Sequence, residues 1–120
     1  MSFINLTNHP SINWDEKQIV AAETYGKIID MQFPAIEAEA DEESIQKLAI
    51  ETVNKVLDMK PTAVLCQGEF TLVYAVVNLL KEHDIPVMAA CSKRETIEEH
   101  TPDGTVKKAL FKFVRFREYK

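Results

Sequence analysis

The sequence of 120 residues lacks the local motifs that mark the best-known nucleotide and hydrolase sites. It contains neither G-x-G-x-x-G nor G-x-x-x-x-G-K-[ST], which excludes the usual dinucleotide fingerprint and the P-loop. G-x-S-x-G and H-E-x-x-H are also missing, so there is no nucleophile elbow and no zincin helix. Any chemistry must therefore use few groups and no recognisable metal motif.

Long apolar runs and targeting signals are absent as well. The longest unbroken apolar run falls far short of the roughly 18–20 residues that span a bilayer. Residues 1–17 have no basic leader and no apolar core of signal-peptide length. We therefore expect a cytoplasmic protein without a membrane partner.

Cysteine and histidine are scarce. Cys66 and Cys91 are expected at the apolar ends of two strands, as small buried hydrophobes, and a disulfide would be unusual in a reducing compartment. His9, His83 and His100 have no metal-ligand spacing relative to either cysteine. We expect neither a metal site nor a cofactor.

An excess of positive charge is also lacking. The formal net charge of −5 makes the chain a poor candidate for binding duplex nucleic acid, which requires many phosphate-neutralising cations. The acidity is uneven: residues 1–60 carry 5 Lys and 11 Asp or Glu, whereas residues 61–120 carry 9 Lys or Arg and 8 Asp or Glu. A local anion site in the second half remains compatible with this charge distribution.

The sequence does contain an alternation of strand and helix patterns. Strands are expected at 3–7, 27–33, 62–66 and 86–91, with helices at 14–25, 42–59 and 70–83. Further β-rich pieces follow at 93–98 and 105–117, joined by a turn at Asp103-Gly104. This order predicts an α/β fold over residues 1–120: one compact Rossmann-like domain of three layers, with a mainly parallel sheet and a C-terminal β-hairpin.

Two helices carry further signals. Asn13 stands three residues before Glu16, a capping-box pattern that predicts Asn13 as the N-cap of the first helix. Glu69 is the expected cap of the third helix. That helix, 70–83, is apolar nearly all round, which predicts either deep burial or contact with a partner subunit.

The final strand interleaves cations with aromatic residues. Ala109, Phe111 and Phe113 share one face, after which the apolar positions shift to Val114 and Phe116. A β-bulge or burial on two sides would explain the shift. A strand with an apolar core face and a basic outer face is favoured here over contact with nucleic acid.

Open parallel sheets bind ligands beyond the carboxyl ends of their strands, and four predicted turns lie there. Together these turns hold a histidine, hydroxyls, amides and two cations, a set that suits a phosphate-bearing ligand. The candidates are Thr7, Asn8, His9, Ser11, Gln67, Gly68, Glu69, Thr71, Ser92, Lys93 and Arg94.

Simpler roles remain open for the same residues. His9 could only shape its turn, Gly68 could only permit one, and Lys93 with Arg94 could form a solvated edge. Trp14 is expected to pack in the core, with stacking against a base as the lesser alternative.

The segment Thr7-Asn8-His9-Pro10-Ser11-Ile12-Asn13-Trp14, directly after an N-terminal strand, resembles the opening of small CRISPR-associated ancillary proteins of type III systems. These proteins have compact Rossmann-like (CARF-like) folds, and the chain length and β-α alternation are similar. The segment Gln67–Thr71 has the placement of their second ligand loop.

The resemblance implies binding of a cyclic oligoadenylate, cyclic tetra-adenylate first of all, by a symmetric homodimer. The dimer would form through the apolar third helix, the C-terminal hairpin or both. Some family members cleave the ring without a metal, when a ribose 2′-hydroxyl attacks the adjacent phosphate, and others only sequester it.

On this resemblance His9 and Ser11 are the catalytic candidates, with His9 in acid–base work or phosphate contact. Asn8 would hydrogen-bond phosphate or ribose, where one branch of the family has arginine, and Lys93 with Arg94 would neutralise phosphates. Two alternatives stand beside the ring nuclease: a non-catalytic binder that acts as a sponge, and a small Rossmann-like module for an ordinary nucleotide or sugar phosphate.

Overall fold

A computed structural model describes all of residues 1–120, and its strands and helices alternate in the predicted order. The strands are β1 (Ser2–Thr7), β2 (Lys27–Gln32), β3 (Pro61–Cys66), β4 (Val87–Thr101) and β5 (Gly104–Glu118). The helices are the short 3-10 helix η1 (Ser11–Asn13), α1 (Glu16–Glu23), α2 (Glu42–Asp58) and α3 (Phe70–Glu82). None of these helices combines the length and apolar character that crossing a membrane requires.

The strands form one sheet in the order β2-β1-β3-β4-β5. β1 pairs in parallel with β2 and β3, and β3 pairs in parallel with the start of β4. Only β4 and β5 pair antiparallel. The predicted α/β fold, with a mainly parallel sheet and a C-terminal hairpin, is confirmed.

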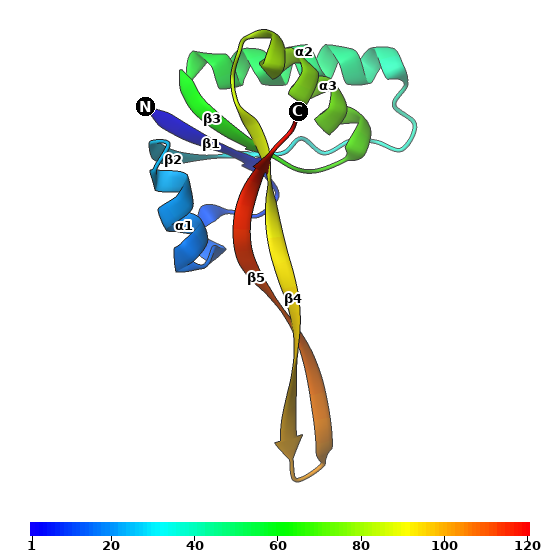
Figure 1. Cartoon of the computed structure of the whole chain (residues 1–120). Helices are drawn as coiled ribbons and strands as arrows, with labels where there is room; N and C mark the ends of the chain where they lie inside the picture. The colour runs from blue at the N-terminus through cyan, green and yellow to red at the C-terminus, as the bar shows by residue number, and fades with distance from the viewer.

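Helices cover both faces of the sheet, with α2 and α3 on one side and α1 on the other (Figure 1). The larger core, under α2 and α3, includes Ile4, Leu6, Val64, Leu72 and Val76. The smaller core, on the α1 side, consists of Phe3, Ala22, Ala63, Leu65 and Met88. Neighbouring residues of β1 and β3 thus enter opposite cores, which is why both strands are buried continuously, from Phe3 to Thr7 and from Ala63 to Cys66.

Each α-helix begins at an acidic N-cap. Asp15 Oδ1 accepts the Gln18 N–H at 2.9 Å, and Asp41 does the same for α2. Glu69 caps α3, as predicted, by accepting the Thr71 and Leu72 N–H groups. The prediction that Asn13 caps the first helix is wrong, because residues 11–13 form η1 and the helix starts only after Asp15.

Helix α3 buries one face only. Its inward residues are Leu72, Val73, Val76, Val77 and Leu80. Phe70 and Tyr74 lie on the opposite face and are 89% and 74% exposed. The helix is therefore not deeply buried within the chain, and an apolar part of its outer face is open to solvent.

The hairpin extends far beyond the body of the protein (Figure 1). We call residues 93–112 the arm; every residue in it is exposed except Glu95, which is partly buried. The two predicted pieces 86–91 and 93–98 are a single strand, β4, because β5 pairs with it without interruption from Ser92 to Thr101.

A β-bulge marks the base of the arm. Cys91 pairs with Arg115 and Ser92 with Phe113, which leaves Val114 as the extra residue. The bulge anticipated from the shifted apolar pattern is thus confirmed. It brings Phe113 and Phe116 to the same side, with ring centroids 4.8 Å apart.

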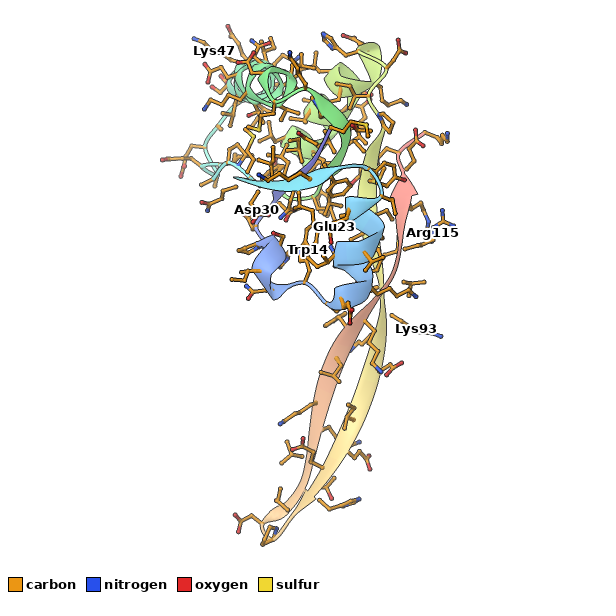
Figure 2. The ribbon with its side chains drawn as sticks, turned by 90° about the vertical axis from the view of Figure 1, so that its left-hand side faces the viewer. Trp14, Glu23, Asp30, Lys47, Lys93 and Arg115 are labelled. Carbon is orange, nitrogen blue, oxygen red and sulfur yellow. The ribbon has the colours of Figure 1, made fainter.

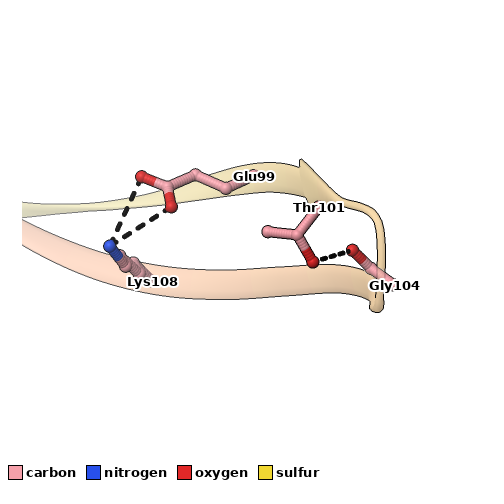
Figure 3. A network of polar contacts seen from close by, with 4 residues as sticks. All are labelled: Glu99, Thr101, Gly104 and Lys108. Atoms are coloured by element: carbon pink, nitrogen blue, oxygen red, sulfur yellow. Dashed lines mark hydrogen bonds and ion pairs between the residues drawn. The ribbon is translucent and has the colours of Figure 1, made fainter.

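The tip of the arm is a two-residue turn formed by Pro102 and Asp103. The predicted turn at Asp103-Gly104 is displaced by one residue, because Gly104 already pairs with Thr101 as the first residue of β5. Figure 3 shows Thr101 Oγ1 donating to the Gly104 carbonyl at 2.8 Å and Lys108 Nζ lying 3.2 Å from Glu99 Oε2.

Candidate functional site

The largest cavity, of about 540 Å³, lies on the α1 side of the sheet, at the carboxyl ends of β1 and β3 and against the base of the arm. We call it the α1-side pocket. Its polar lining comes from Thr7, His9, Asn13, Asp15, Gln18, Gln67 and Ser92. Its apolar lining comes from Trp14, Leu65, Ala90, Phe111 and Phe113. This is the position at which open α/β sheets bind ligands.

The turn after β1 is held in place by a buried amide. Asn5, only 1% exposed, donates from Nδ2 to the His9 carbonyl at 2.9 Å and to Asp30 Oδ1 at 2.8 Å. Its Oδ1 accepts the Thr7 hydroxyl at 2.8 Å, and Thr7 Oγ1 accepts the His9 N–H at 3.0 Å. Because the polar groups of Asn5 are satisfied, the turn has a fixed shape.

His9 is therefore fixed by its backbone and free at its side chain. Its carbonyl also accepts Trp14 Nε1–H at 3.1 Å, which ties the indole to the turn. His9 is exposed and lines the α1-side pocket, and its imidazole forms no hydrogen bond within the chain. A histidine held this way is available to a ligand as a donor, an acceptor or a proton carrier.

Asp15 connects α1 to the arm. While Oδ1 caps the helix, Oδ2 accepts the Phe113 N–H at 3.1 Å, next to the bulge. Both carboxylate oxygens thus bind backbone amides at the wall of the pocket. This contact fixes the base of β5 relative to the first helix.

Gln67 closes the gap where β3 and β4 separate. Its Oε1 accepts the Ala90 N–H at 2.9 Å, two residues beyond the last paired positions, Leu65 and Met88. Since the oxygen is engaged by a donor, the amide nitrogen is the part of this side chain left for a ligand. Gln67 was predicted as a ligand residue, and it lines the pocket.

An aromatic cluster in the smaller core adjoins the pocket. The Phe3 ring lies 5.2 Å from Phe116, 5.7 Å from Tyr25 and 6.4 Å from Trp14. Trp14 thus packs on the core, as expected, and also lines the pocket. Phe111, at the opposite rim, is 69% exposed.

Two predicted residues, Asn8 in the turn after β1 and Ser11 at the start of η1, lie outside this pocket. Ser11 donates from Oγ to Asp30 Oδ2 at 3.0 Å and does not line the α1-side pocket. Asn8 lines a separate hollow of about 230 Å³ between the ends of β1 and β2, which it shares with Asp30. Thr7 borders both cavities.

The turn before α3 is explained by local structure. A Cβ added to Gly68 would lie 2.4 Å from Cδ1 of Phe33, so this glycine permits close packing against that ring. Hydrogen bonds from the Thr71 hydroxyl and from the N–H groups of Leu72 and Thr71 lower the pKa of Glu69. Neither Glu69 nor Thr71 lines the α1-side pocket.

The two cations at the base of the arm are divided between its faces. Successive residues of a strand alternate, so Arg94 shares a face with Ser92, whereas Lys93 lies on the other. Arg94 pairs directly with Phe111, at the rim of the pocket. Figure 2 shows Lys93 pointing away from Trp14, and neither cation forms an ion pair within the chain.

The cysteines play no part in the pocket. Burial raises the pKa of Cys66 to about 12, so its thiol stays neutral and unreactive near neutral pH. Its carbonyl accepts the Tyr119 hydroxyl at 2.9 Å, and burial raises the pKa of that phenol. Cys91 is free and partly buried.

Sequence reasoning missed part of the lining. The sequence predicts Asn13 as a cap and Trp14 mainly as a packing residue, and no local motif marks Asp15 or Gln18 as ligand residues. Phe111 lies 97 positions after Trp14 (111 − 14), so no local pattern joins them. Only the pairing of β5 with β4 brings Phe111 to the pocket.

No group of three or more His, Cys, Asp or Glu side chains converges as a metal site would require.

Comparison with known proteins identifies the family of this chain. No curated protein and no solved structure matches the chain. A family model matches residues 1–117, nearly the entire chain, and the protein therefore belongs to the Uncharacterized protein MJ1673 family.

Proposed function

We propose that the α1-side pocket binds a cyclic oligoadenylate, cyclic tetra-adenylate first of all, in cytoplasmic type III CRISPR signalling. One observation carries the proposal. The segment 7–14, which resembles the opening of the CRISPR-associated ancillary proteins, also lines the largest cavity, through Thr7, His9, Asn13 and Trp14. The volume of about 540 Å³ lies within the range of about 300–1,000 Å³ found for small-molecule sites.

The lining suits adenine. Asn13 and Gln18 supply carboxamides, the groups that pair best with the N6 and N7 edge of adenine, and the amide nitrogen of Gln67 can donate to a ligand acceptor. Trp14 and the exposed Phe111 offer aromatic surface on which a base can stack. Arg94, beside Phe111, is the nearest cation for a phosphate.

Ring opening needs no protein nucleophile. The 2′-oxygen of a ribose attacks the adjacent phosphorus and loses its proton, the bond from phosphorus to the 5′-oxygen breaks, and that oxygen takes up a proton. The products are a 2′,3′-cyclic phosphate and a 5′-hydroxyl. His9 serves as the acid or base, and Gln67 and Ser92 hold the phosphate or ribose. Ser11, bonded to Asp30, shapes the turn that carries His9.

A sponge is the second candidate, and one observation favours it. No group in the chain hydrogen-bonds the His9 imidazole, so nothing orients that ring for proton transfer before a ligand binds. Binding without turnover would follow if the ligand does not orient it either.

The test uses cyclic tetra-adenylate with the full chain in the presence of a metal chelator. Binding is followed by calorimetry and thermal shift, and products by chromatography. The ring nuclease predicts linear products, lost in His9→Ala and kept in His83→Ala, whose histidine follows α3 away from the pocket. Binding of the intact ring by wild type and His9→Ala would establish the sponge. Stabilisation by mononucleotides alone, or no binding, would contradict both.

A further inference from the structure

The arm leaves a long strand edge without a partner. β3 pairs with β4 only at Val87 and Met88, and the Ala90 N–H is then taken by Gln67. From Cys91 to Thr101, where the turn begins, the outer edge of β4 faces no other strand. Such an edge presents a row of free N–H and C=O groups and is a ready template for another strand.

The arm also exposes apolar side chains. Ile97, Val106 and Leu110 lie on one face of the ribbon and are 40%, 43% and 40% exposed. A two-stranded ribbon without cover on either face is only marginally stable in water. The 15-residue strands β4 and β5 are long compared with the usual strand of 3–10 residues.

The free edge is complementary in charge to itself. Antiparallel pairing of two identical strands about a two-fold axis at Thr96 places Lys93 opposite the partner subunit's Glu99. It also places Arg94 opposite the partner subunit's Glu98. Lys93 and Arg94 are the cations of the arm that lack an ion pair within their own chain. Opposite charges directly across two strands stabilise the pairing.

Two independent features select this register. Thr96 is the midpoint of the free edge 91–101, so this axis pairs every available residue. Side chains that lie opposite each other share a face, so the axis must pass through a residue. Moving it to Glu95 or to Ile97 brings Glu95 against the partner subunit's Glu95 or Glu99, and like charges in that position are destabilising.

We infer that two copies of this chain join through the outer edges of β4, paired antiparallel from Cys91 to Thr101 around Thr96. The interface is isologous, as a closed dimer requires. The outer edge of β5 is less suited to pair with its own copy, because the strand contains only one acidic residue, Glu118. Its cations number five: Lys107, Lys108, Lys112, Arg115 and Arg117. The exposed pair Phe70 and Tyr74 of α3 is the alternative surface, and the experiments below separate the two.

This pairing would complete the α1-side pocket. His100 lies opposite the partner subunit's Ser92 in the proposed register, and both residues belong to the face that carries Phe111. Each arm would thus bring an imidazole to the mouth of the other chain's pocket. This assignment rests on the proposed function: each pocket would contain His9 of its own chain and, as a further ligand contact, His100 of the partner subunit.

Cysteine substitution tests the register without a ligand. With Cys91→Ser as background, Thr96→Cys should form a disulfide-linked dimer on mild oxidation. Thr101→Cys should link to the native Cys91 of the partner and fail to link when Cys91 is Ser. Directly opposed residues have Cα atoms about 4.5–5.5 Å apart, within the range for a disulfide. Loss of both links would overturn the proposed register.

The position of His100 has its own test. In the same background, Ser92→Cys and His100→Cys proteins should each stay unlinked, since each residue lies about 26 Å from its own copy, eight residues along the strand. Their mixture should give the linked heterodimer. If the mixture stays unlinked while Thr96→Cys links, the contribution of His100 to the neighbouring pocket is refuted.

Charge exchange tests the interface itself by light scattering. Wild type should be a dimer, and Lys93→Glu/Arg94→Glu and Glu98→Lys/Glu99→Lys should each be monomeric. Mixed, the two variants should recover a 1:1 dimer, because all four pairs are then attractive. A monomeric wild type, or a dimer lost in Phe70→Ser/Tyr74→Ser and kept in the charge variants, would overturn the inference. None of these measurements depends on whether cyclic tetra-adenylate binds.

Discussion

The body and the arm share the strands β4 and β5, yet different forces hold them. In the body both faces of the sheet are covered, and residues such as Phe3, Leu65 and Val87 are at most 1% exposed. In the arm neither face is covered, and three ion pairs join exposed side chains across the strands. Exposed pairs contribute only about 0.2–1 kcal/mol each. Burial fixes the body, whereas the arm depends on its turn, its ladder and what it contacts.

The largest expected difference comes from removing one large side chain from each region. Phe3→Ala should cost about 3–5 kcal/mol of unfolding free energy, because Phe3 is fully buried and contacts three aromatic rings. Ile97→Ala should cost about 0.5 kcal/mol or less when the chain is kept monomeric by dilution. Urea unfolding of both variants measures the contrast, and equal losses would contradict it.

The second prediction concerns pH. The pKa of Cys66 is raised from 9.0 to about 12, so the neutral thiol stabilises the fold below pH 9 and this contribution is lost as the pH rises toward 12. Relative to Cys66→Ala, wild type should lose about 1.4 kcal/mol per pH unit within this window. Val64→Ala, a neighbouring buried substitution without a titrating group, should keep the wild-type slope. Urea titrations from pH 8 to 11 provide the comparison, and identical slopes in wild type and Cys66→Ala would refute the assignment.

A smaller effect is expected where body and arm meet. Asp15→Ala removes the α1 cap and the acceptor for the Phe113 N–H, which should cost about 1 kcal/mol. Amide exchange at Phe113 should accelerate in this variant. Asp41→Ala removes the α2 cap without touching the arm, so exchange at Phe113 should stay as in wild type. Equal acceleration in both variants would mean that Asp15 does not fix the base of the arm.

The smallest effect is expected within the arm. Lys112→Ala removes the shortest cross-strand ion pair, 3.0 Å to Glu95, and should cost less than about 1 kcal/mol in the monomer. The cost should shrink further at high salt, which screens exposed charges. Amide exchange in the arm, measured at low and high salt, tests this. A loss that does not respond to salt would point to packing by the lysine stem.

The sequence alone could predict the fold class, because the order of apolar strands and amphipathic helices is a local property. The bulge was predictable for the same reason, from the shift between Phe113 and Val114. The exposure of the arm could not be predicted. Its residues alternate as those of any half-buried hairpin would, and only the structure shows that β1, β2 and β3 are too short to lie beside it. Asn13 shows the limit for caps: the capping-box pattern favours it, but residues 11–13 form η1 and Asp15 caps the helix instead.

The candidate site was predictable only at its local part. His9 and Gln67 follow the ends of β1 and β3, the pattern that predicts them, and both line the pocket. Ser92 also lines it, but from within β4, which continues past the predicted strand end at residue 91. Ser11 and Thr71 follow strand ends too, but Asp30 and Glu69 bind their hydroxyls. A sequence does not show which polar group already has a partner. Phe111 required the long-range pairing of two strands.

The uninterrupted run of β4 from the sheet into solvent makes the arm a lever whose pivot adjoins the pocket. Ten residues of strand extend about 33 Å, so a tilt of about 5° at Ser92 would move the tip by about 3 Å. A ligand that changes the orientation of the base of β4 relative to Gln67 would therefore cause its largest displacement at the tip of the hairpin. In an assembly joined along this edge, that motion would arrive at the neighbouring pocket, and occupancy of one site would set the geometry of the other.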